Sequence, residues 1–397
     1  MRIALMQLYS YVPTPDYDQI ARGLRALGHI VWIAQPNESG DIDWNDGSGI
    51  VATLRGPAAE RDSVFMLPGL RMMLRRLNYY RSNLRLRRFL KGARFDVVQI
   101  NPWLGSWILA AGAPMHTLYV LDIRQAGITA RSAWEAIFRD RLARLKWILQ
   151  SKYIFGRTCF LDEYGAQRVL GPNWSRWATV VPLGVSPEFR SFSWGCSANR
   201  LSSGIVRFVY IGTLDKMRKL ETILIAAQSV FRETDRFEVV LIGPDTSNGY
   251  YLKLIQELGI SGAVSIWPPV RYADIPSILA DFDVALAVVP DAPAWRYQPT
   301  LKVLEYRALG MPIIATDLQP NRRIVLDGVN GVIVKDSPES LANGMRRFVA
   351  EAGFLDSCTA RARVMRESKS WIDVARDYEE NVYGCGRCHE AGLVQSV

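Results

Sequence analysis

The chain has 397 residues, of which 49% are hydrophobic and 22% are charged, and its formal net charge is +9. This length predicts two domains, and the composition favours packed cores over intrinsic disorder. No apolar run approaches the roughly 18 residues of a membrane-spanning helix, and the chain opens on a strand rather than a signal sequence. We therefore expect a cytoplasmic protein, and the five cysteines fit a reducing compartment rather than a disulfide framework.

The first half of the chain alternates apolar runs with amphipathic segments. The expected elements are strands over residues 2–8, 30–35, 95–103 and 117–125, and helices over residues 16–29 and 132–150. Repeated strand–helix–strand units predict a parallel, doubly wound sheet, because such a connection returns the chain to the same face.

One basic segment carries as much positive charge as the net charge of the whole chain. Between Asp62 and Asp96 the sequence has no acidic residue, and its basic residues are Arg71, Arg75, Arg76, Arg81, Arg85, Arg87, Arg88, Lys91 and Arg94. Apolar and aromatic residues recur along residues 66–94 at approximately helical spacing. A basic amphipathic helix of this kind suits an anionic membrane surface, where each basic residue contributes on the order of 1 kcal/mol.

The residues expected to contact the membrane are Arg71, Arg75, Arg76, Arg81, Arg85 and Arg88. A helix packed on the sheet with its arginines in water is the plainer alternative. Nucleic acid is a weaker one, because no nucleic-acid-reading motif accompanies the patch.

A polar segment rich in Gly and Ser, at residues 190–204, predicts a linker between two domains. Strands and helices alternate again beyond it, so a second doubly wound domain is expected. Its expected elements include strands within residues 205–211 and 237–243, and helices over 337–349 and 368–384.

Residues 291–334 hold the densest signal in the chain. Pro299 and Thr300 mark a helix start, where a threonine side chain can cap free amides, and Gly310 marks the helix end. Residues 311–316, MPIIAT, are a short apolar run typical of a strand buried on both faces.

Two charged residues follow that helix start. A helix N-terminus offers unpaired N–H groups and the positive end of a dipole, which suits a phosphate. Lys302 adds a cation in the first turn, and Glu305 lies three residues further on the same side. The amides and the lysine would hold a diphosphate, and the carboxylate would hold ribose hydroxyls. An exposed Lys–Glu pair is the plainer alternative.

The run PTLKVLEYRALGMPIIATD, followed by IVLDGVNGVIV, resembles the donor-binding segment of family 4 retaining glycosyltransferases. In that family a Pro-x-Lys-x-x-Glu-Tyr or Glu-x7-Glu motif leads into Ala-x-Gly-x-Pro-Val-Ile-Ala-Thr, then Asp-Gly-x-Asn-Gly. The likeness is close from Pro299 to Val334 and fainter over nearly the whole chain.

This resemblance implies the GT-B fold, an α/β architecture of two doubly wound, Rossmann-like parallel-sheet domains facing across a cleft. A C-terminal helix would cross back to the first domain. The expected limits are 1–193 for the acceptor-side domain, 204–362 for the nucleotide-sugar-binding domain and 363–384 for the crossing helix.

The resemblance also assigns site residues. The second Glu of the family motif, which binds the ribose, falls at Glu305, and the first, which faces the donor sugar, falls at Tyr297. A family loop that reads Gly-Arg-Leu and then Lys-Gly holds the donor diphosphate. Here Thr213 replaces its arginine and Arg218 falls at its lysine, so a cationic cradle survives. The full donor-binding set is Gly212, Thr213, Arg218, Lys219, Val270, Arg271, Tyr297, Thr300, Leu301, Lys302 and Glu305, with Lys216 as a spare candidate.

Asp122 ends the strand at residues 117–125 and aligns with the carboxylate of a His-Asp or His-Glu pair in the family. The resemblance implies that Asp122 contacts the donor sugar or an acceptor hydroxyl, and that Arg124 steadies a phosphate. A structural Asp122–Arg124 ion pair is the alternative, and His116 is expected to be structural. The residues expected to act in catalysis are Asp122, Arg218 and Lys302.

These signals together predict a retaining, hexosyltransferase-type enzyme that uses a nucleotide-sugar as co-substrate, with no cofactor and no metal. Its acceptor would be a membrane-associated saccharide or lipid-linked molecule in cell-surface polysaccharide or glycolipid assembly. The enzyme would then lie peripherally on the inner face of the membrane, with no nucleic-acid partner. The alternatives are a non-catalytic GT-B protein that binds a partner or membrane, and a nucleotide-sugar epimerase.

The last residues include Cys385-Gly-Arg-Cys388-His389, the spacing of c-type haem attachment. Because no haem pocket or export signal accompanies it, a plain tail is the preferred interpretation, and an adventitious metal-binding or redox pair is the weaker alternative.

Overall fold

The computed structural model describes residues 1–8, 15–56, 68–103, 105–126, 133–192, 194, 204–293 and 295–384, with the backbone alone at 15, 68–76 and 133–137. The chain forms two compact units. The first joins Met1–Gly184 to the residues from Trp371 onward, and the second is Val185–Ser370. The Cys385–His389 tail lies outside the described residues.

The first unit is built on an eight-stranded sheet with the order β4-β3-β2-β1-β5-β6-β7-β8. Its strands are β1 (Arg2–Met6), β2 (Ile30–Pro36), β3 (Ile42–Asn45), β4 (Ile50–Leu54), β5 (Val97–Ile100), β6 (Leu118–Ile123), β7 (Arg157–Phe160) and β8 (Thr179–Val180). From β2 to β8 every neighbouring pair is parallel, which confirms the expected doubly wound topology.

An antiparallel hairpin, β3–β4, extends one edge of that sheet and was not predicted. Its turn is tied by Asn45, whose side-chain oxygen accepts a hydrogen bond from the Gly47 amide at 2.7 Å. Trp44 of β3 is fully buried and stacks on Phe95 with ring centroids 6.0 Å apart. The Asp-Gly pair between two short apolar runs was the sequence signal for this hairpin.

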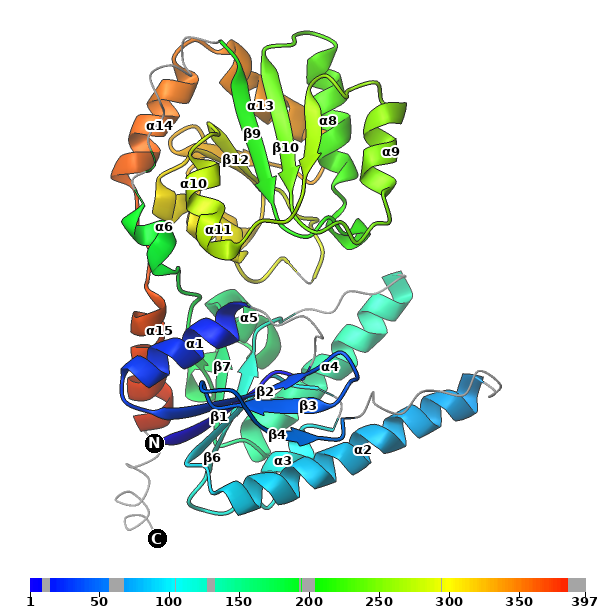
Figure 1. Cartoon of the computed structure of the whole chain (residues 1–397), viewed down its shortest axis with the longest axis vertical. Coiled ribbons are helices and arrows are strands. Elements are labelled where there is room, and N and C mark those ends of the chain that lie inside the picture. The colour runs from blue at the N-terminus through cyan, green and yellow to red at the C-terminus, as the bar shows by residue number, and fades with distance from the viewer. Residues whose placement is uncertain are drawn as a thin grey trace. The chain divides into compact units, whose positions relative to one another are not determined.

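The helices of the first unit are α1 (Pro15–Ala26), α2 (Pro68–Ala93), α3 (Trp107–Ala110), α4 (Ala133–Tyr153), α5 (Glu163–Leu170) and α15 (Trp371–Asp377), which continues into a π-helical segment, Tyr378–Tyr383. Figure 1 shows α15 beside α1, so the C-terminal residues return to the first unit. The two helices approach closely at Gly23, where a Cβ would lie 2.8 Å from the Ala375 Cβ.

The second unit is built on a six-stranded, wholly parallel sheet with the order β11-β10-β9-β12-β13-β14. Its strands are β9 (Val206–Ile211), β10 (Phe237–Ile242), β11 (Val264–Trp267), β12 (Val284–Ala287), β13 (Ile313–Thr316) and β14 (Gly331–Val334). Side chains of β13 alternate between two apolar cores: Ile314 packs in one, and Ile313 and Ala315 pack in the other. This confirms the prediction of a strand buried on both faces.

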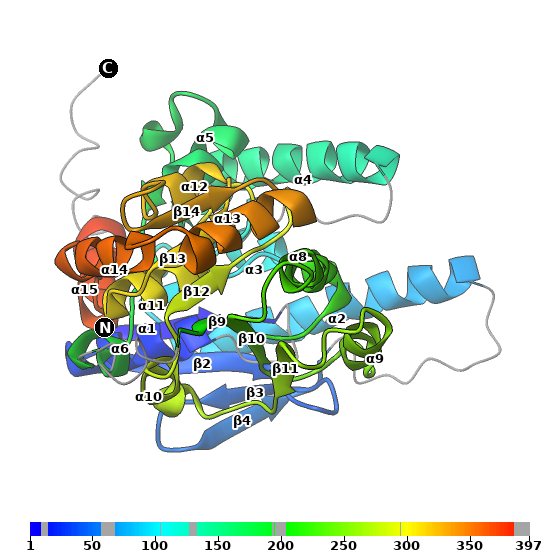
Figure 2. The same ribbon diagram turned by 90° about the horizontal axis from the view of Figure 1, so that it is seen from above.

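Helices cover both faces of the second sheet, as Figure 2 shows. They are α6 (Pro187–Ser191), α8 (Glu221–Phe231), α9 (Tyr250–Glu257), α10 (Ile275–Leu279), α11 (Leu301–Leu309), α12 (Gln319–Arg322), α13 (Pro338–Ala350) and α14 (Phe354–Val364). Apolar residues of α8 and α13 form the core on one face, and those of α6, α10 and α11 form the core on the other.

The second unit begins at Val185, which precedes residues 190–204, the segment expected to link the two domains. Val185, Phe189 and Trp194 pack in its core, and the Trp194 indole donates to the Leu279 carbonyl at 3.1 Å. Most of residues 190–204 lie outside the described part of the chain. At the other end, the return to the first unit begins at Trp371.

Candidate functional site

Two glycines allow neighbouring loops to approach closely at the carboxyl edge of the second sheet. Gly212 follows β9 and Gly243 follows β10, with φ angles of 149° and 147° that favour glycine. A Cβ on Gly243 would lie 2.2 Å from the Gly212 carbonyl oxygen, so a side chain there would collide with the neighbouring loop. Ligands of parallel α/β sheets bind at this edge of the strands.

Helix α11 begins at the same edge and is fixed to β9. The Tyr306 hydroxyl accepts a hydrogen bond from the Ile211 amide at 3.2 Å. Gly310 ends the helix with a φ of 79°, as the sequence predicts. The expectation for Thr300 is wrong in one respect, because its side chain makes no capping hydrogen bond at the helix start.

Lys302 points from α11 toward Gly212. Its side chain is only 8% exposed, and its Nζ lies 3.7 Å from the centroid of the Tyr210 ring. A Cβ on Gly212 would lie 3.2 Å from this Nζ. No hydrogen-bond partner for the ammonium is found among the described residues. Burial, reinforced by Arg218, lowers the pKa of Lys302 well below its usual value.

Arg218 supplies a second cation. It lies in a 3-10 turn, Lys216–Arg218, whose start is capped by Asp215, which accepts from the Met217 amide at 2.6 Å. The Arg218 guanidinium carbon lies 5.2 Å from the ring centroid of Trp295. Because Arg218 lies close enough to lower the affinity of Lys302 for its proton, the two side chains form a site that suits an anion.

Glu305 lies one helical turn beyond Lys302 and is also only 8% exposed. Its carboxylate accepts a hydrogen bond from the Tyr272 hydroxyl at 2.5 Å. Burial raises the pKa of Glu305 to about 7, against the opposing effects of Tyr272 and Lys302. The alternative of a solvent-exposed Lys–Glu pair is therefore excluded by the burial of both side chains.

Three aromatic residues of this cluster were missed by the sequence analysis: Tyr210, Tyr272 and Trp295. Tyr210 stands two residues before Gly212 on β9, and Tyr272 directly follows Arg271 in a 3-10 turn, Tyr272–Asp274. The Arg271 side chain itself is 86% exposed and pairs with Asp274 at 2.7 Å. Proximity of Tyr272 to the predicted base-binding residues was the only signal available.

The remaining donor-binding predictions fall on partly or fully exposed positions. Thr213, Val270, Tyr297 and Leu301 are half-buried, and Lys219 is exposed. Lys219 has φ and ψ of 49°, a left-handed conformation that favours glycine. This explains why the family motif has Gly at the corresponding position.

The first unit holds a second buried charge cluster, centred on Asp122 at the end of β6. Asp122 is fully buried, and its Oδ2 accepts from the Tyr17 hydroxyl at 2.9 Å and from Gln99 Nε2 at 2.8 Å. Arg124 Nη1 completes an ion pair with the same oxygen at 3.2 Å. Tyr378 places its hydroxyl 3.4 Å away, from the returning C-terminal segment.

This geometry does not support contact between Asp122 and a donor sugar. Arg124 also pairs with Asp16 at 3.0 Å, and its pKa is raised because these two carboxylates outweigh the effect of burial. The structure thus contains the Asp122–Arg124 ion pair that the sequence left as an alternative. One atom of each partner, Asp122 Oδ1 and Arg124 Nη2, has no hydrogen bond within the described residues.

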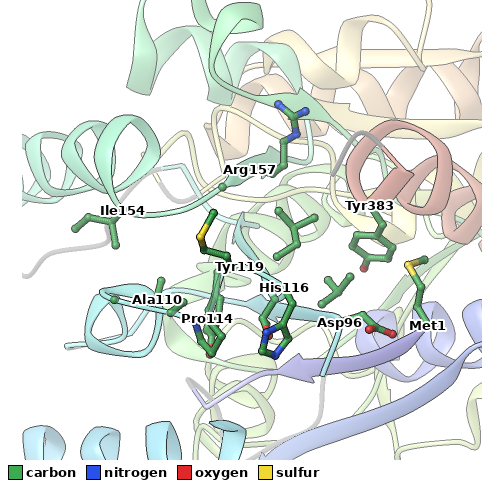
Figure 3. A pocket seen from close by; sticks show the side chains of 16 residues that line it. Met1, Asp96, Ala110, Pro114, His116, Tyr119, Ile154, Arg157 and Tyr383 are labelled. Atoms are coloured by element: carbon green, nitrogen blue, oxygen red, sulfur yellow. The ribbon is translucent and has the colours of Figure 1, made fainter. Parts of the chain in front are cut away.

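A pocket of about 760 Å³ lies at the opposite edge of the first sheet (Figure 3). Met1, Asp96 and Arg157 line it from the amino ends of their strands, with His116 and Tyr383 nearby. Because ligands of such sheets bind at the carboxyl edge, this pocket is separate from the predicted site.

Helix α2 presents its basic residues to solvent in the part whose side chains are described. Arg81, Arg85 and Arg88 are exposed, whereas the side chains of Arg71, Arg75 and Arg76 lie outside the described set. Of the helices that the structure describes, none combines the length and apolarity needed to cross a bilayer.

Solved structures with the same architecture include proteins named as a glycosyltransferase, a galactosyltransferase and a sucrose-phosphate synthase. Sucrose-phosphate synthase from Thermosynechococcus elongatus is 15% identical, with a TM-score of 0.68 over 98% of this chain and 99% of that chain. Anabaena Alr3699/HepE in complex with UDP-glucose is 13% identical, with a TM-score of 0.66 over 97% and 100%. With its two Rossmann-like units, the protein has the GT-B fold.

Family models identify the chain more closely. Residues 206–351 match "Glycosyl transferases group 1" and residues 16–171 match "Glycosyl transferase 4-like domain". The chain belongs to the group 1 glycosyltransferase family. The D-inositol 3-phosphate glycosyltransferase of Thermobifida fusca is 25% identical over 301 residues, which are 70% of this chain and 67% of that protein. Further relatives of that name match over as little as 36% of their own length.

Proposed function

We propose that the protein transfers a hexosyl group from a nucleotide-sugar to an acceptor hydroxyl, with retention of anomeric configuration and without a metal ion. One observation carries this proposal: the buried Lys302 ammonium lacks a hydrogen-bond partner among the described residues and lies beside Gly212, at the carboxyl edge of the second sheet. A buried cation without a partner is costly, so the arrangement fits an anionic ligand that completes it.

The diphosphate of the donor would bind Lys302, Arg218 and the N-terminus of α11. Lys302 is a point charge, whereas the guanidinium of Arg218 can contact two phosphate oxygens at once. Glu305, one turn deeper, would accept hydrogen bonds from the ribose hydroxyls. Stabilisation of the charge that develops on the departing phosphate is the main catalytic contribution of such a site.

The proposed transfer breaks the bond between the anomeric carbon and the diphosphate oxygen. The acceptor oxygen attacks the same face of the sugar that the diphosphate leaves, and a phosphate oxygen takes the acceptor's proton. This front-face displacement gives retention and needs no protein nucleophile. Asp122 has no part in it, because its carboxylate is buried and ion-paired.

The proposed acceptor is a membrane-associated saccharide or lipid-linked molecule in cell-surface polysaccharide or glycolipid assembly. The exposed arginines of α2 support a peripheral position on the cytoplasmic membrane face. Relatives of this chain are named for D-inositol 3-phosphate, so that acceptor belongs in the same assay.

Thermal stabilisation by nucleoside diphosphates and nucleotide-sugars, in the presence of a metal chelator, tests the donor proposal. A ligand that binds only the folded protein raises its melting temperature. Uridine nucleotides come first in the panel, because Alr3699/HepE was solved with UDP-glucose. We expect a shift with one base that is lost in Glu305→Ala and retained in Lys253→Ala, whose side chain is 77% exposed and paired with Glu257 on α9.

Absence of any shift at millimolar ligand would contradict the donor proposal and favour the non-catalytic GT-B alternative. Once the donor and acceptor are known, NMR of the product measures its anomeric configuration. An inverted product would overturn the proposed front-face displacement while leaving the donor site intact.

A further inference from the structure

Helix α4 exposes a continuous apolar stripe. Its members are Phe138, Leu142, Leu145, Leu149 and Tyr153, which are between 46% and 78% exposed. Their spacing of four, three, four and four residues places them on one face of a helix. Contiguous exposed apolar side chains on a protein surface mark an interaction site.

The opposite face of α4 accounts for how the helix is held in the fold. Trp147, Gln150 and Ser151 are buried there, and the Lys146 ammonium donates to the Trp103 carbonyl at 3.4 Å. The helix therefore packs on the first unit along one side and leaves the stripe without a partner in the described part of the chain.

Basic residues flank the stripe on both sides. At 3.6 residues per turn, Arg141 and Lys152 fall along one border and Arg139 falls along the other, whereas Lys146 donates inward to Trp103. Asp140, the only carboxylate between Phe138 and Tyr153, is buried and ion-paired with Arg168. An apolar face bordered by cations is the pattern of a helix that lies in the interface of an anionic membrane.

Aromatic residues gather at the C-terminal end of the stripe. The Lys152 ammonium lies 5.3 Å from the ring centroid of Trp177, and the Arg176 guanidinium carbon lies 5.5 Å from it. Tyr153, beside them, is the most exposed member of the stripe. Tyrosine and tryptophan side chains favour the polar–apolar boundary of a bilayer.

Helix α2 belongs to the same side of the first unit. Trp103 connects the two helices, because its indole donates to Asn83 of α2 at 2.8 Å while its carbonyl accepts from Lys146 of α4. Both views show α2 and α4 extending in the same direction from the sheet (Figures 1 and 2). On α2, Leu77 and Leu84 are exposed among the arginines.

We propose that α4 inserts its apolar stripe into the interfacial region of an anionic membrane, while the flanking basic residues and those of α2 contact lipid headgroups. This inference rests on the membrane association proposed above, and it identifies α4 as the surface that contacts the membrane. A second copy of the chain is disfavoured as the occupant, because pairing two such stripes would bring cations against cations.

Co-sedimentation with phosphatidylcholine vesicles, with and without phosphatidylglycerol, tests the proposal. The double variant Leu142→Ser/Leu145→Ser removes the centre of the stripe, and Leu252→Ser/Leu326→Ser is the matched control, since those leucines of the second unit are 53% and 44% exposed. We expect the stripe variant to bind the anionic vesicles at least tenfold more weakly than wild type, and the control to bind as wild type does. Unchanged thermal melting verifies that both fold.

Three results would overturn the inference. Wild-type binding by the stripe variant, with weaker binding by Arg81→Ala/Arg85→Ala, would assign attachment to α2 alone. A wild-type dimer that the stripe variant converts to a monomer, in sedimentation velocity, would assign the stripe to a second copy. Failure of wild type to bind anionic vesicles would remove both this inference and the proposed membrane acceptor. The donor site would be unaffected, since nucleotide-dependent thermal shifts report on it separately.

Discussion

Each unit of the protein has a cluster of charged side chains at the carboxyl edge of its sheet. The two clusters differ in whether the buried cation is paired with a carboxylate. In the first unit, Arg124 is paired with Asp122 and Asp16 at 3.2 Å and 3.0 Å. In the second unit, Lys302 has no hydrogen-bond partner among the described residues, and Arg218 is its cationic neighbour.

The pKa values of the two buried cations shift in opposite directions as a result. Carboxylates raise the pKa of Arg124 despite its burial, whereas burial and Arg218 together lower the pKa of Lys302. Removing one partner from a cluster whose buried charges are already paired destabilises the fold, whereas an unpaired buried charge fits a ligand that would pair it. On this contrast we propose a structural role for Asp122 and a binding role for Lys302.

The largest effect should come from Asp122→Ala. Removal of one partner leaves Arg124 buried with fewer counter-charges, so we expect a loss of about 3–5 kcal/mol in the free energy of unfolding. Urea denaturation measures it. Retained stability together with abolished transfer would instead make Asp122 catalytic and erase the contrast between the clusters.

The second-largest effect should be a pH dependence of the free energy of unfolding that comes from Glu305. Its pKa in the folded protein is about 7 against an ordinary 4.5, so the folded state holds its proton more tightly. The protonated Glu305 side chain therefore contributes about 3 kcal/mol to the free energy of unfolding. This contribution is fully present below pH 4.5 and is lost as the pH rises through 7. The difference in unfolding free energy between wild type and Glu305→Gln, measured from pH 4 to pH 8, isolates this effect. A flat difference would contradict it.

Lys302→Met removes the buried ammonium while it keeps most of the side-chain volume. In the absence of ligand, we expect the variant to be as stable as wild type or more stable by about 1–2 kcal/mol, because no partner is left unpaired. Chemical denaturation without nucleotide measures this. A large loss of stability would show that Lys302 is a structural residue, as Asp122 is.

Tyr272→Phe should have the smallest effect. It deletes the hydroxyl that donates to Glu305 at 2.5 Å, at a cost of about 1 kcal/mol in stability. Because this hydrogen bond lowers the pKa of Glu305, its loss should move the stability transition to higher pH. The same pH series on Tyr272→Phe checks the direction, and a shift to lower pH would contradict it.

Sequence alone predicted the features that depend on neighbouring residues. The α11 helix, its end at Gly310 and the two-faced strand β13 follow from local spacing, and the GT-B fold follows from the resemblance that those residues carry. The β3–β4 hairpin was missed because its strands are short and only its turn is distinctive.

Features that depend on distant contacts were not predictable. Asp122 is enclosed by Tyr378, 256 residues away in sequence, so its burial is invisible to local patterns. Tyr272 reaches Glu305 across 33 residues from a separate turn. For α4, spacing predicts a helix, but only the packing of Trp147 shows which face remains exposed.

The central claim is that a diphosphate completes the Lys302 cluster. Calorimetric titration of the nucleoside diphosphate that gives the largest thermal shift, into wild type, Lys302→Met and Lys216→Met, tests it most directly. Lys216, the spare candidate, is the comparison because it lies in the same turn as Arg218 but is exposed, over the Tyr250 ring. We predict about 100-fold weaker binding, roughly 2.7 kcal/mol, for Lys302→Met and near-wild-type binding for Lys216→Met. Unchanged affinity in Lys302→Met, or equal losses in both variants, would contradict the claim.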